Sequence, residues 1–156
     1  MTTQSNPTTI SIKVSFEKSL NKTGLPLLQT QKNGYNLYFL LDTGANKNYT
    51  RRDFLDIPEL NADTEFLPDK EEFYGIDNVC HLTETCSFSF NLADLNYVVT
   101  YQVIEDGSAL TFPTINGVPF HVVGILGTPF MIKHNTIINF ATSEVIFNTP
   151  KVAKEP

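Results

Sequence analysis

The sequence has no tryptophan, only two cysteines, no long hydrophobic run and fewer basic than acidic residues. Its 11 Lys and Arg against 17 Asp and Glu give a net charge of −6, whereas a nucleic-acid-binding surface needs an excess of basic residues. The same deficit argues against binding at a membrane surface. No apolar stretch approaches the roughly 20 residues that cross a bilayer as a helix. Nucleic acids and membranes are therefore not expected partners.

Chain length indicates a single domain. A chain of 156 residues can bury a sizeable core without covalent cross-links. We expect a flexible N-terminus over 1–7, one domain over 8–148 and a flexible tail over 149–156. The opening residues MTTQSN lack the basic and apolar segments of a secretory signal. The default expectation is a cytoplasmic protein, or a periplasmic or secreted one if a signal has been removed.

Cysteines and histidines are too few and too scattered to indicate a metal site. Cys80 and Cys86 are expected to be a pair of small buried or half-buried thiols. A disulfide across a hairpin is the alternative in an oxidising compartment. Zinc is the weakest interpretation, because together with His81 the two cysteines do not match the spacing of a structural site. We expect His81, His121 and His134 to be surface or loop residues, and we expect no metal and no cofactor.

Aromatic content and alternation indicate β structure. The 12 Phe and 6 Tyr favour strands. Residues 9–17 alternate apolar and polar side chains, which is typical of a half-buried strand. Asn33-Gly34 predicts a tight hairpin turn, because both residues tolerate a positive φ. Further strands are expected over 24–31, 35–41, 71–83 (a hairpin), 86–92, 97–104, 120–127 and 136–147 (a hairpin).

Short helices are expected between some of these strands. One would begin at Thr50, with its side chain as the cap, and end at Pro58. Another would begin with Thr128 as the N-cap and Pro129 as the first helical residue. The acidic segment 69–72 is expected to be a solvated loop. Short strands at regular spacing predict an all-β barrel or sandwich with one or two short helices.

Two segments of the chain are alike. Residues 39–45 (FLLDTGA) and 123–129 (VGILGTP) are both apolar strands that end in a glycine turn and lead into a short helix. The likeness suggests two related half-domains. Only the first segment carries a carboxylate.

That carboxylate belongs to Asp42, in the sequence Asp42-Thr43-Gly44 behind the apolar run 37–41. A carboxyl group at the tip of a buried strand sits where burial and neighbours can tune its pKa. Gly44 lets the backbone approach closely and leaves its N–H free to hold the carboxylate. The Thr43 hydroxyl can fix the turn by hydrogen bonding. The alternative is an ordinary β-turn, in which all three residue types are common.

The chain resembles the retropepsin-like aspartic protease family in its bacterial single-domain form. LLDTGA over 40–45 is similar to that family's catalytic loop. Ile125, Leu126 and Gly127 resemble its second hallmark, an apolar strand that ends in glycine before a short helix. Tyr74-Gly75 falls where the family places its flap, the hairpin that closes over the substrate. The likeness extends over roughly residues 8 to 148.

The resemblance implies a closed all-β barrel of the acid-protease type and an endopeptidase that works as a homodimer on a peptide or protein substrate. The residues implied as catalytic are Asp42, Thr43 and Gly44, with Thr43 bracing the two loops across the dimer axis. Those implied in substrate binding are Ala45, Tyr74, Gly75 and Ile76. Those implied as a structural motif are Ile125, Leu126 and Gly127.

Some residues depart from the family's pattern. Asn46-Lys47-Asn48 follows Ala45, where a small hydroxyl residue is usual. We expect Lys47 to point to solvent, because lysine is rarely buried. The segment 74–78 is less rich in glycine than the flaps of relatives and carries Asp77.

Two alternatives remain open from the sequence. The first is a catalytically inactive retropepsin-like domain that serves as a dimerisation or peptide-binding module. The second is a β-barrel unrelated to proteases, which requires both motifs to be coincidental.

Overall fold

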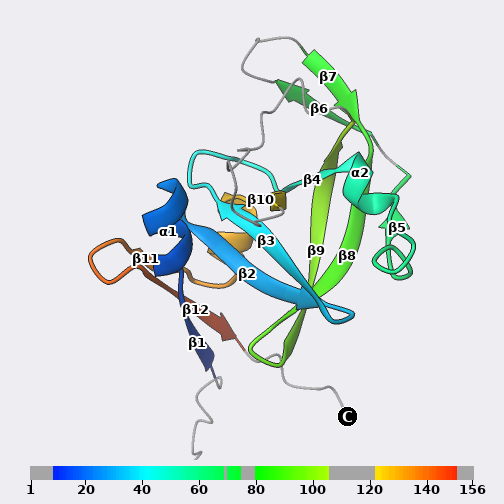
Figure 1. The fold of residues 1–156 in the computed structure, drawn as a ribbon. Helices are drawn as coiled ribbons and strands as arrows, with labels where there is room; N and C mark the ends of the chain where they lie inside the picture. The colour runs from blue at the N-terminus through cyan, green and yellow to red at the C-terminus, as the bar shows by residue number, and fades with distance from the viewer. Residues whose placement is uncertain (1–8, 69, 75–79, 106–121, 151–156) are drawn as a thin grey trace, which may run out of the picture.

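The computed structural model describes residues 9–68, 70–74, 80–105 and 122–150, and strands dominate them (Figure 1). The strands are β1 (Thr9–Ser15), β2 (Leu27–Lys32), β3 (Tyr35–Leu41), β4 (Tyr49–Arg51), β5 (Glu65–Phe66), β6 (Glu71–Tyr74), β7 (Cys80–Thr83), β8 (Thr85–Leu92), β9 (Leu95–Ile104), β10 (Val122–Leu126), β11 (Ile137–Asn139) and β12 (Glu144–Pro150). The helices are α1 (Glu17–Thr23), α2 (Arg52–Leu55) and α3 (Thr128–Lys133).

Six of the strands close into a barrel. They follow the order β2-β3-β10-β4-β9-β8, and β8 returns to β2 through the pair Gln31 and Asn91. The short strand β5 flanks β8 from outside this ring. Closure satisfies the backbone groups that an open sheet leaves at its edges. The prediction of an all-β closed barrel is confirmed.

Phenylalanine and tyrosine side chains fill the barrel. The rings of Phe88 and Tyr101 stack with centroids 4.2 Å apart, and Phe39 contacts both Phe90 and Tyr101. All four side chains are at most 1% exposed, and they come from β3, β8 and β9. Alternate residues of each strand point inward, as the apolar alternation in the sequence predicts.

Two further sheets lie outside the barrel. The strands β1, β12 and β11 form one antiparallel sheet, and β6 pairs with β7 in a separate hairpin. Figure 1 shows the β6–β7 hairpin projecting at one end of the molecule and the β1–β12 pair near the other. No helix among the described residues has the length and apolar character needed to cross a membrane.

The hairpin turn and both predicted helices are present, but their caps differ from expectation. Asn33 and Gly34 have φ values of 50° and 82°, as a tight turn between β2 and β3 requires. Thr50 lies inside β4 and donates to the carbonyl of Val123, so Arg51 is the N-cap of α2. The N-cap of α3 is Gly127, and Thr128 is the first residue of the helix. In both cases the threonine hydroxyl donates to a backbone carbonyl distant in the sequence instead of capping the helix.

The helix α1 is a correction to the sequence-based prediction, which extended the first strand to Glu17 and expected at most two helices. This helix has only seven residues and ends at Gly24, whose φ of 76° is the left-handed conformation common at helix ends. Two turns are too few to show a helical period. Ser19, buried inside α1, bonds the carbonyls of Phe16 and Leu25 and so fixes the chain's return to β2.

The two cysteines do not form a disulfide, and only one of them fits the expectation of a buried thiol. Both are free; Cys86 is buried and Cys80 is exposed. Burial raises the pKa of the Cys86 thiol to about 12. Cys86 is therefore an inert core residue, while Cys80 lies at the start of β7 on the surface.

His134 is a second correction, because it is buried and not a surface residue. It ends α3, and its ring lies 4.4 Å from the ring of Phe130 and 4.9 Å from that of Tyr97. Its Nδ1 is 3.0 Å from the hydroxyl of Thr149. Burial, and then the charge of Lys133, lower the pKa of His134 to about 4. Of the other two histidines, His121 lies outside the described residues, and only the backbone of His81, in β7, is described.

We expect His134 to make the fold less stable in mild acid. Its pKa is about 4 when folded and 6.5 when unfolded, so between these values the unfolded chain binds more protons. Stability contributed by the neutral ring is present above pH 6.5 and is lost as the pH falls toward 4, by about 2 kcal/mol at pH 5. Urea unfolding of the wild type and of His134→Gln at pH 7 and pH 5 measures this loss. An equal loss of stability in both proteins would show that His134 does not cause it.

Candidate active site

Asp42 follows the last residue of β3, at the edge of the barrel where β10 also ends. The strands β3 and β10 are parallel neighbours, with Leu41 opposite Leu126. The backbone N–H of Asp42 donates to the carbonyl of Leu126 at 3.1 Å. Because parallel strands finish at the same edge of a sheet, the two alike segments 39–45 and 123–129 lie side by side. The carboxylate turn and the glycine of the second motif therefore meet in space.

The turn after β3 holds the carboxylate of Asp42 in place. The N–H of Gly44 donates to Oδ1 of Asp42 at 2.8 Å, and the N–H of Ala45 donates to its carbonyl at 3.2 Å. Asp42 is half-buried, while Thr43 and Gly44 are exposed. A Cβ on residue 44 would come 3.2 Å from Oδ1, so glycine keeps this contact unstrained. The turn therefore holds one oriented, half-buried carboxyl group beside an exposed threonine.

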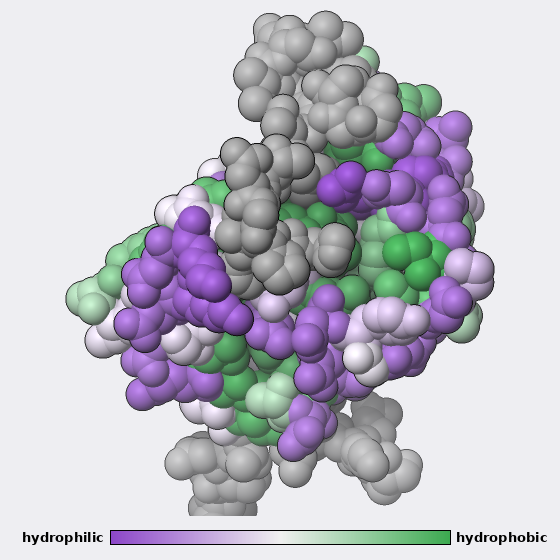
Figure 2. Space-filling view, in the orientation of Figure 1, coloured by the Kyte–Doolittle hydropathy of each residue, from purple (hydrophilic) through white to green (hydrophobic). Residues whose placement is uncertain are grey.

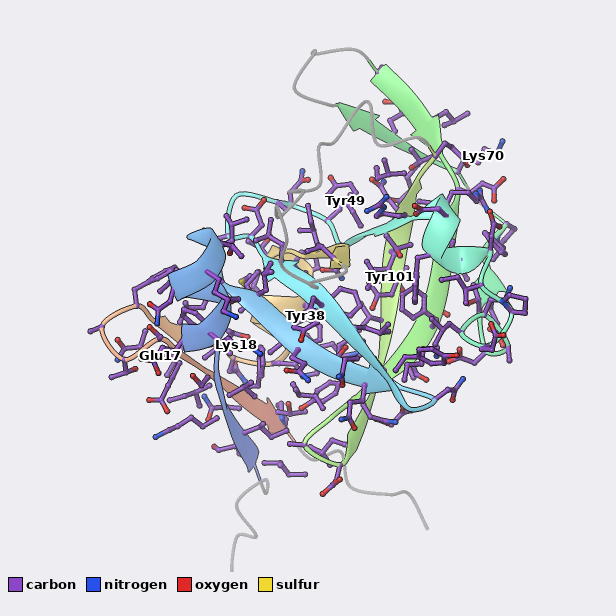
Figure 3. The ribbon with its side chains drawn as sticks, in the orientation of Figure 1. Glu17, Lys18, Tyr38, Tyr49, Lys70 and Tyr101 are labelled. Carbon is purple, nitrogen blue, oxygen red and sulfur yellow. The ribbon has the colours of Figure 1, made fainter. Side chains whose placement is uncertain are left out.

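An apolar cluster lies next to this carboxylate on the outer side of the barrel wall. Its buried members are Leu27, Tyr49, Ile104, Val122 and Ile125, with Leu25, Tyr38, Leu40 and Ala45 packed against them. Burial, and then the negative charge of Asp42, raise the pKa of Tyr49. Figure 3 labels Tyr38 and Tyr49 on β3 and β4.

Hydrogen bonds across the barrel fix the rest of the loop. Thr128 donates to the carbonyl of Ala45 from its N–H at 2.9 Å and from its hydroxyl at 3.2 Å. Asn48 accepts from the N–H of Gly127 at 2.9 Å through Oδ1 and donates to the carbonyl of Thr100 through Nδ2. The loop after Asp42 is thus bound to β10, α3 and β9. The sequence shows Asn48 only as a departure from the family's pattern, and its place between these elements comes from the tertiary structure.

Gly127 leaves no room for a side chain. An added Cβ would contact the carbonyl oxygen of Lys47 and would lie 2.6 Å from that of Ala45. The residue has φ −96°, which any amino acid adopts, so the requirement is for space and not for an unusual backbone conformation. Close approach of the loop 45–47 to the second motif depends on this glycine.

Lys47 does not simply point to solvent as expected. Its Nζ forms an ion pair with Oε2 of Glu71 at 2.6 Å, and Nε2 of Gln102 donates to the same oxygen at 2.8 Å. The bonds from Lys47 and then Gln102 hold the pKa of Glu71 below its usual value. Glu71 belongs to β6, so the expectation of a loop is wrong for this residue, while its side chain stays 44% exposed. These contacts join the loop after Asp42 to the base of the β6–β7 hairpin.

The hairpin expected to act as a flap is present as β6 and β7. Backbone pairing runs from Glu71 opposite Thr83 to Tyr74 opposite Cys80. Gly75 and Ile76 lie outside the described residues, and only the backbone position of Tyr74 is described. The implied contact of these three residues with a substrate stays a prediction.

Two cavities lie near the ends of the strands that carry the site. One, of about 310 Å³, adjoins the loop 46–48 and the base of the hairpin. Another, of about 340 Å³, is lined by residues at the start of β3 and around α2, and Figure 2 shows apolar surface in a hollow beside α2. Because β3 starts at Tyr35 and ends beside Asp42, only the first cavity adjoins the carboxylate loop. Within the described ranges, no three His, Cys, Asp or Glu side chains are placed to hold a metal ion.

The architecture has counterparts among solved structures. A retropepsin-like aspartic protease from Rickettsia conorii matches with a TM-score of 0.53 and 12% identity, over 97% of this chain and 100% of that one. The retroviral protease-like domain of Ddi1 from Leishmania major matches with a TM-score of 0.48 and 14% identity, over 81% and 92% of the two chains. No protein-family model and no curated protein matches the sequence. The first of these likenesses shows that the chain has the retropepsin-like fold.

Proposed function

We propose that this protein is an aspartic endopeptidase whose active site forms when two copies pair, each contributing Asp42. The observation that carries the proposal is the position of Asp42 at the end of a buried strand, held by the N–H of Gly44 at 2.8 Å. Within the retropepsin-like fold, this is the edge at which β3 and β10 meet. The carboxyl group of Asp42 is oriented by this hydrogen bond, and it forms no ion pair with a charged side chain in the described part of the chain.

Peptide hydrolysis by carboxyl groups requires two of them. One must be ionised to take a proton from water, and the other must be protonated to donate a hydrogen bond to the carbonyl oxygen. Two carboxyl groups in close contact share one proton because both cannot ionise at once. The sequence has a single Asp-Thr-Gly and no Asp-Ser-Gly. A second copy, related by a two-fold axis, would supply the missing group.

Pairing assigns a role to each residue of the turn. The two Asp42 side chains would meet at the axis, where one activates a water and the other polarises the scissile carbonyl. The exposed hydroxyl of Thr43 would brace the two loops, and Gly44 would keep each carboxylate oriented. The β6–β7 hairpin would hold an extended peptide by strand-like backbone hydrogen bonds.

Cleavage should therefore depend on protein concentration. At low concentration the monomer carries half a site, so activity per molecule should rise with concentration and level off once the protein is fully paired. A fluorogenic library of extended peptides measures the rate, and sedimentation at the same concentrations measures the mass. Full activity from a protein that is monomeric at every concentration would contradict the proposal. A dimer that binds peptides without cutting any of them would favour the peptide-binding module instead.

A further inference from the structure

The carboxylate of Glu71 bonds two separate elements of the barrel at once. Nζ of Lys47 lies 2.6 Å from its Oε2, and Nε2 of Gln102 donates to the same oxygen at 2.8 Å. Lys47 belongs to the loop that follows Asp42, Gln102 belongs to β9, and Glu71 is the first residue of β6. We name these three side chains the Glu71 latch, because they join the base of the hairpin to the loop of the candidate catalytic residue.

The barrel side of the latch is a fixed frame. Gln102 is only 2% exposed, and its backbone N–H donates to the carbonyl of Asn48 at 2.8 Å. Asn48 in turn accepts from the N–H of Gly127 at 2.9 Å through its side chain. Lys47 is the chain neighbour of this bonded residue. Both donors of the latch therefore start from the same frame that holds the turn of Asp42.

The hairpin side of the latch has less support. Glu71 lies opposite Thr83, whose buried hydroxyl donates to the carbonyl of Glu71 at 3.3 Å. Among the described strands, β6 and β7 pair only with each other, and Figure 1 shows them projecting from the barrel. A two-stranded hairpin by itself is marginally stable in water. The position of this hairpin therefore depends on the bonds at its base.

The Lys47–Glu71 pair is exposed enough to open without unfolding the barrel. The side chains of Lys47 and Glu71 are 41% and 44% exposed, so water and ions reach both charges. Such pairs add little to the stability of a fold, because solvent and salt screen them. This pair nevertheless connects residues 24 positions apart in two different elements. The exposed pair of Arg51 and Asp53, in contrast, joins residues two positions apart.

We propose that the Glu71 latch is a salt-sensitive device that sets the position of the β6–β7 hairpin relative to the loop of Asp42. Lys47 and Glu71 are then positioning residues for peptide binding. This inference rests on the proposed function, because it is there that the hairpin holds a peptide. With the latch closed, the base of the hairpin is held against the loop 46–48. Added salt weakens the attraction between the two charges, so the closed fraction falls as ionic strength rises.

The chain carries a natural attachment site for a probe of hairpin position. Cys80 is exposed at the start of β7, opposite Tyr74, whereas Cys86 is buried and its thiol pKa is raised to about 12. A thiol-reactive nitroxide should therefore label Cys80 alone. Electron paramagnetic resonance of the label then reports the motion of the hairpin, whether or not the protein cleaves peptides.

Label mobility in the wild type should rise when salt is raised from about 0.01 M to about 1 M. Lys47→Met and Glu71→Gln should show the higher mobility already at low salt, with little further response. Lys47→Arg keeps the charge and should keep the response. The matched control is Asp53→Asn, which removes a carboxylate from the exposed pair with Arg51 and should behave like the wild type. Equal mobility in all of these proteins at both salt concentrations would overturn the proposal.

Peptide cleavage at low salt tests the positioning role. Lys47→Met and Glu71→Gln should each raise KM by about fivefold and leave kcat nearly unchanged, because a loose hairpin weakens ground-state and transition-state binding alike. The double variant should be no weaker than either single one, because both substitutions break the same contact. Asp53→Asn should keep the wild-type KM. Wild-type KM values in both latch variants would overturn the positioning role.

The two measurements separate this proposal from the proposed function. A salt-dependent label in a protein that cleaves no peptide would support the latch and count against the protease. Cleavage by a protein whose label ignores salt and both substitutions would leave the protease standing and overturn the latch.

Discussion

Replacing Asp42 by asparagine should lower the rate of peptide cleavage by about a thousandfold or more, while leaving the fold intact. A positioned acid or base contributes about a hundred- to ten-thousandfold to such a reaction. Asparagine can neither take a proton from water nor give one to the substrate at working pH. Its side-chain oxygen can still accept the hydrogen bond that Gly44 donates at 2.8 Å, so the turn should keep its shape. Loss of activity should therefore come without loss of stability.

Kinetics and unfolding measurements on the same preparation separate these two effects. The matched control is Asp94→Asn, an exposed residue in the turn between β8 and β9 whose φ of 66° asparagine tolerates. The control should cleave at the wild-type rate. Adding excess Asp42→Asn protein to the wild type should also suppress cleavage, because mixed pairs would hold one carboxyl group instead of two. Wild-type rates from Asp42→Asn alone would show that Asp42 is not the catalyst.

Replacing Gly127 by alanine should have the second-largest effect, on both stability and cleavage. The added Cβ would contact the carbonyl oxygen of Lys47 and lie 2.6 Å from that of Ala45, which no side-chain rotation can relieve. The loop 45–47 would have to move away from the second motif. We expect a loss of about 3 kcal/mol in unfolding free energy. A displacement of the loop by about 1 Å would reduce cleavage by roughly a hundredfold.

The control for this substitution is Gly24→Ala, which makes the same chemical change at the end of α1. A Cβ there meets no atom within 4 Å, and the cost comes only from the left-handed φ of 76°. That cost is about 1 kcal/mol, and cleavage should be unaffected. If the two variants lose equal stability and Gly127→Ala keeps full activity, close approach at Gly127 does not position the loop.

Sequence patterns were sufficient for most of the strands, because alternation reports which face of a strand is buried. The run 35–41 is β3 residue for residue, and Asn33-Gly34 forms the turn that its composition predicts. Short elements were harder. The helix α1 is too brief to show a period, and the hydroxyls of Thr50 and Thr128 were assigned to local caps although they bond distant carbonyls. The residue type at a helix start predicts a local capping hydrogen bond, but it does not show whether the hydroxyl will instead bond a carbonyl that is distant in the sequence.

The sequence by itself determined that a carboxylate follows a buried strand, that glycine stands two residues later, and that a second apolar motif ends in glycine. Only the tertiary structure decided what surrounds them. Asn48 meets Gly127 across 79 residues of chain, and Glu71 meets Gln102 across 31. Closure of the barrel brings these residues together, and no local pattern encodes which strands become neighbours. For this reason Asp42 could be proposed as the catalytic residue from the sequence, whereas the pocket beside it could not.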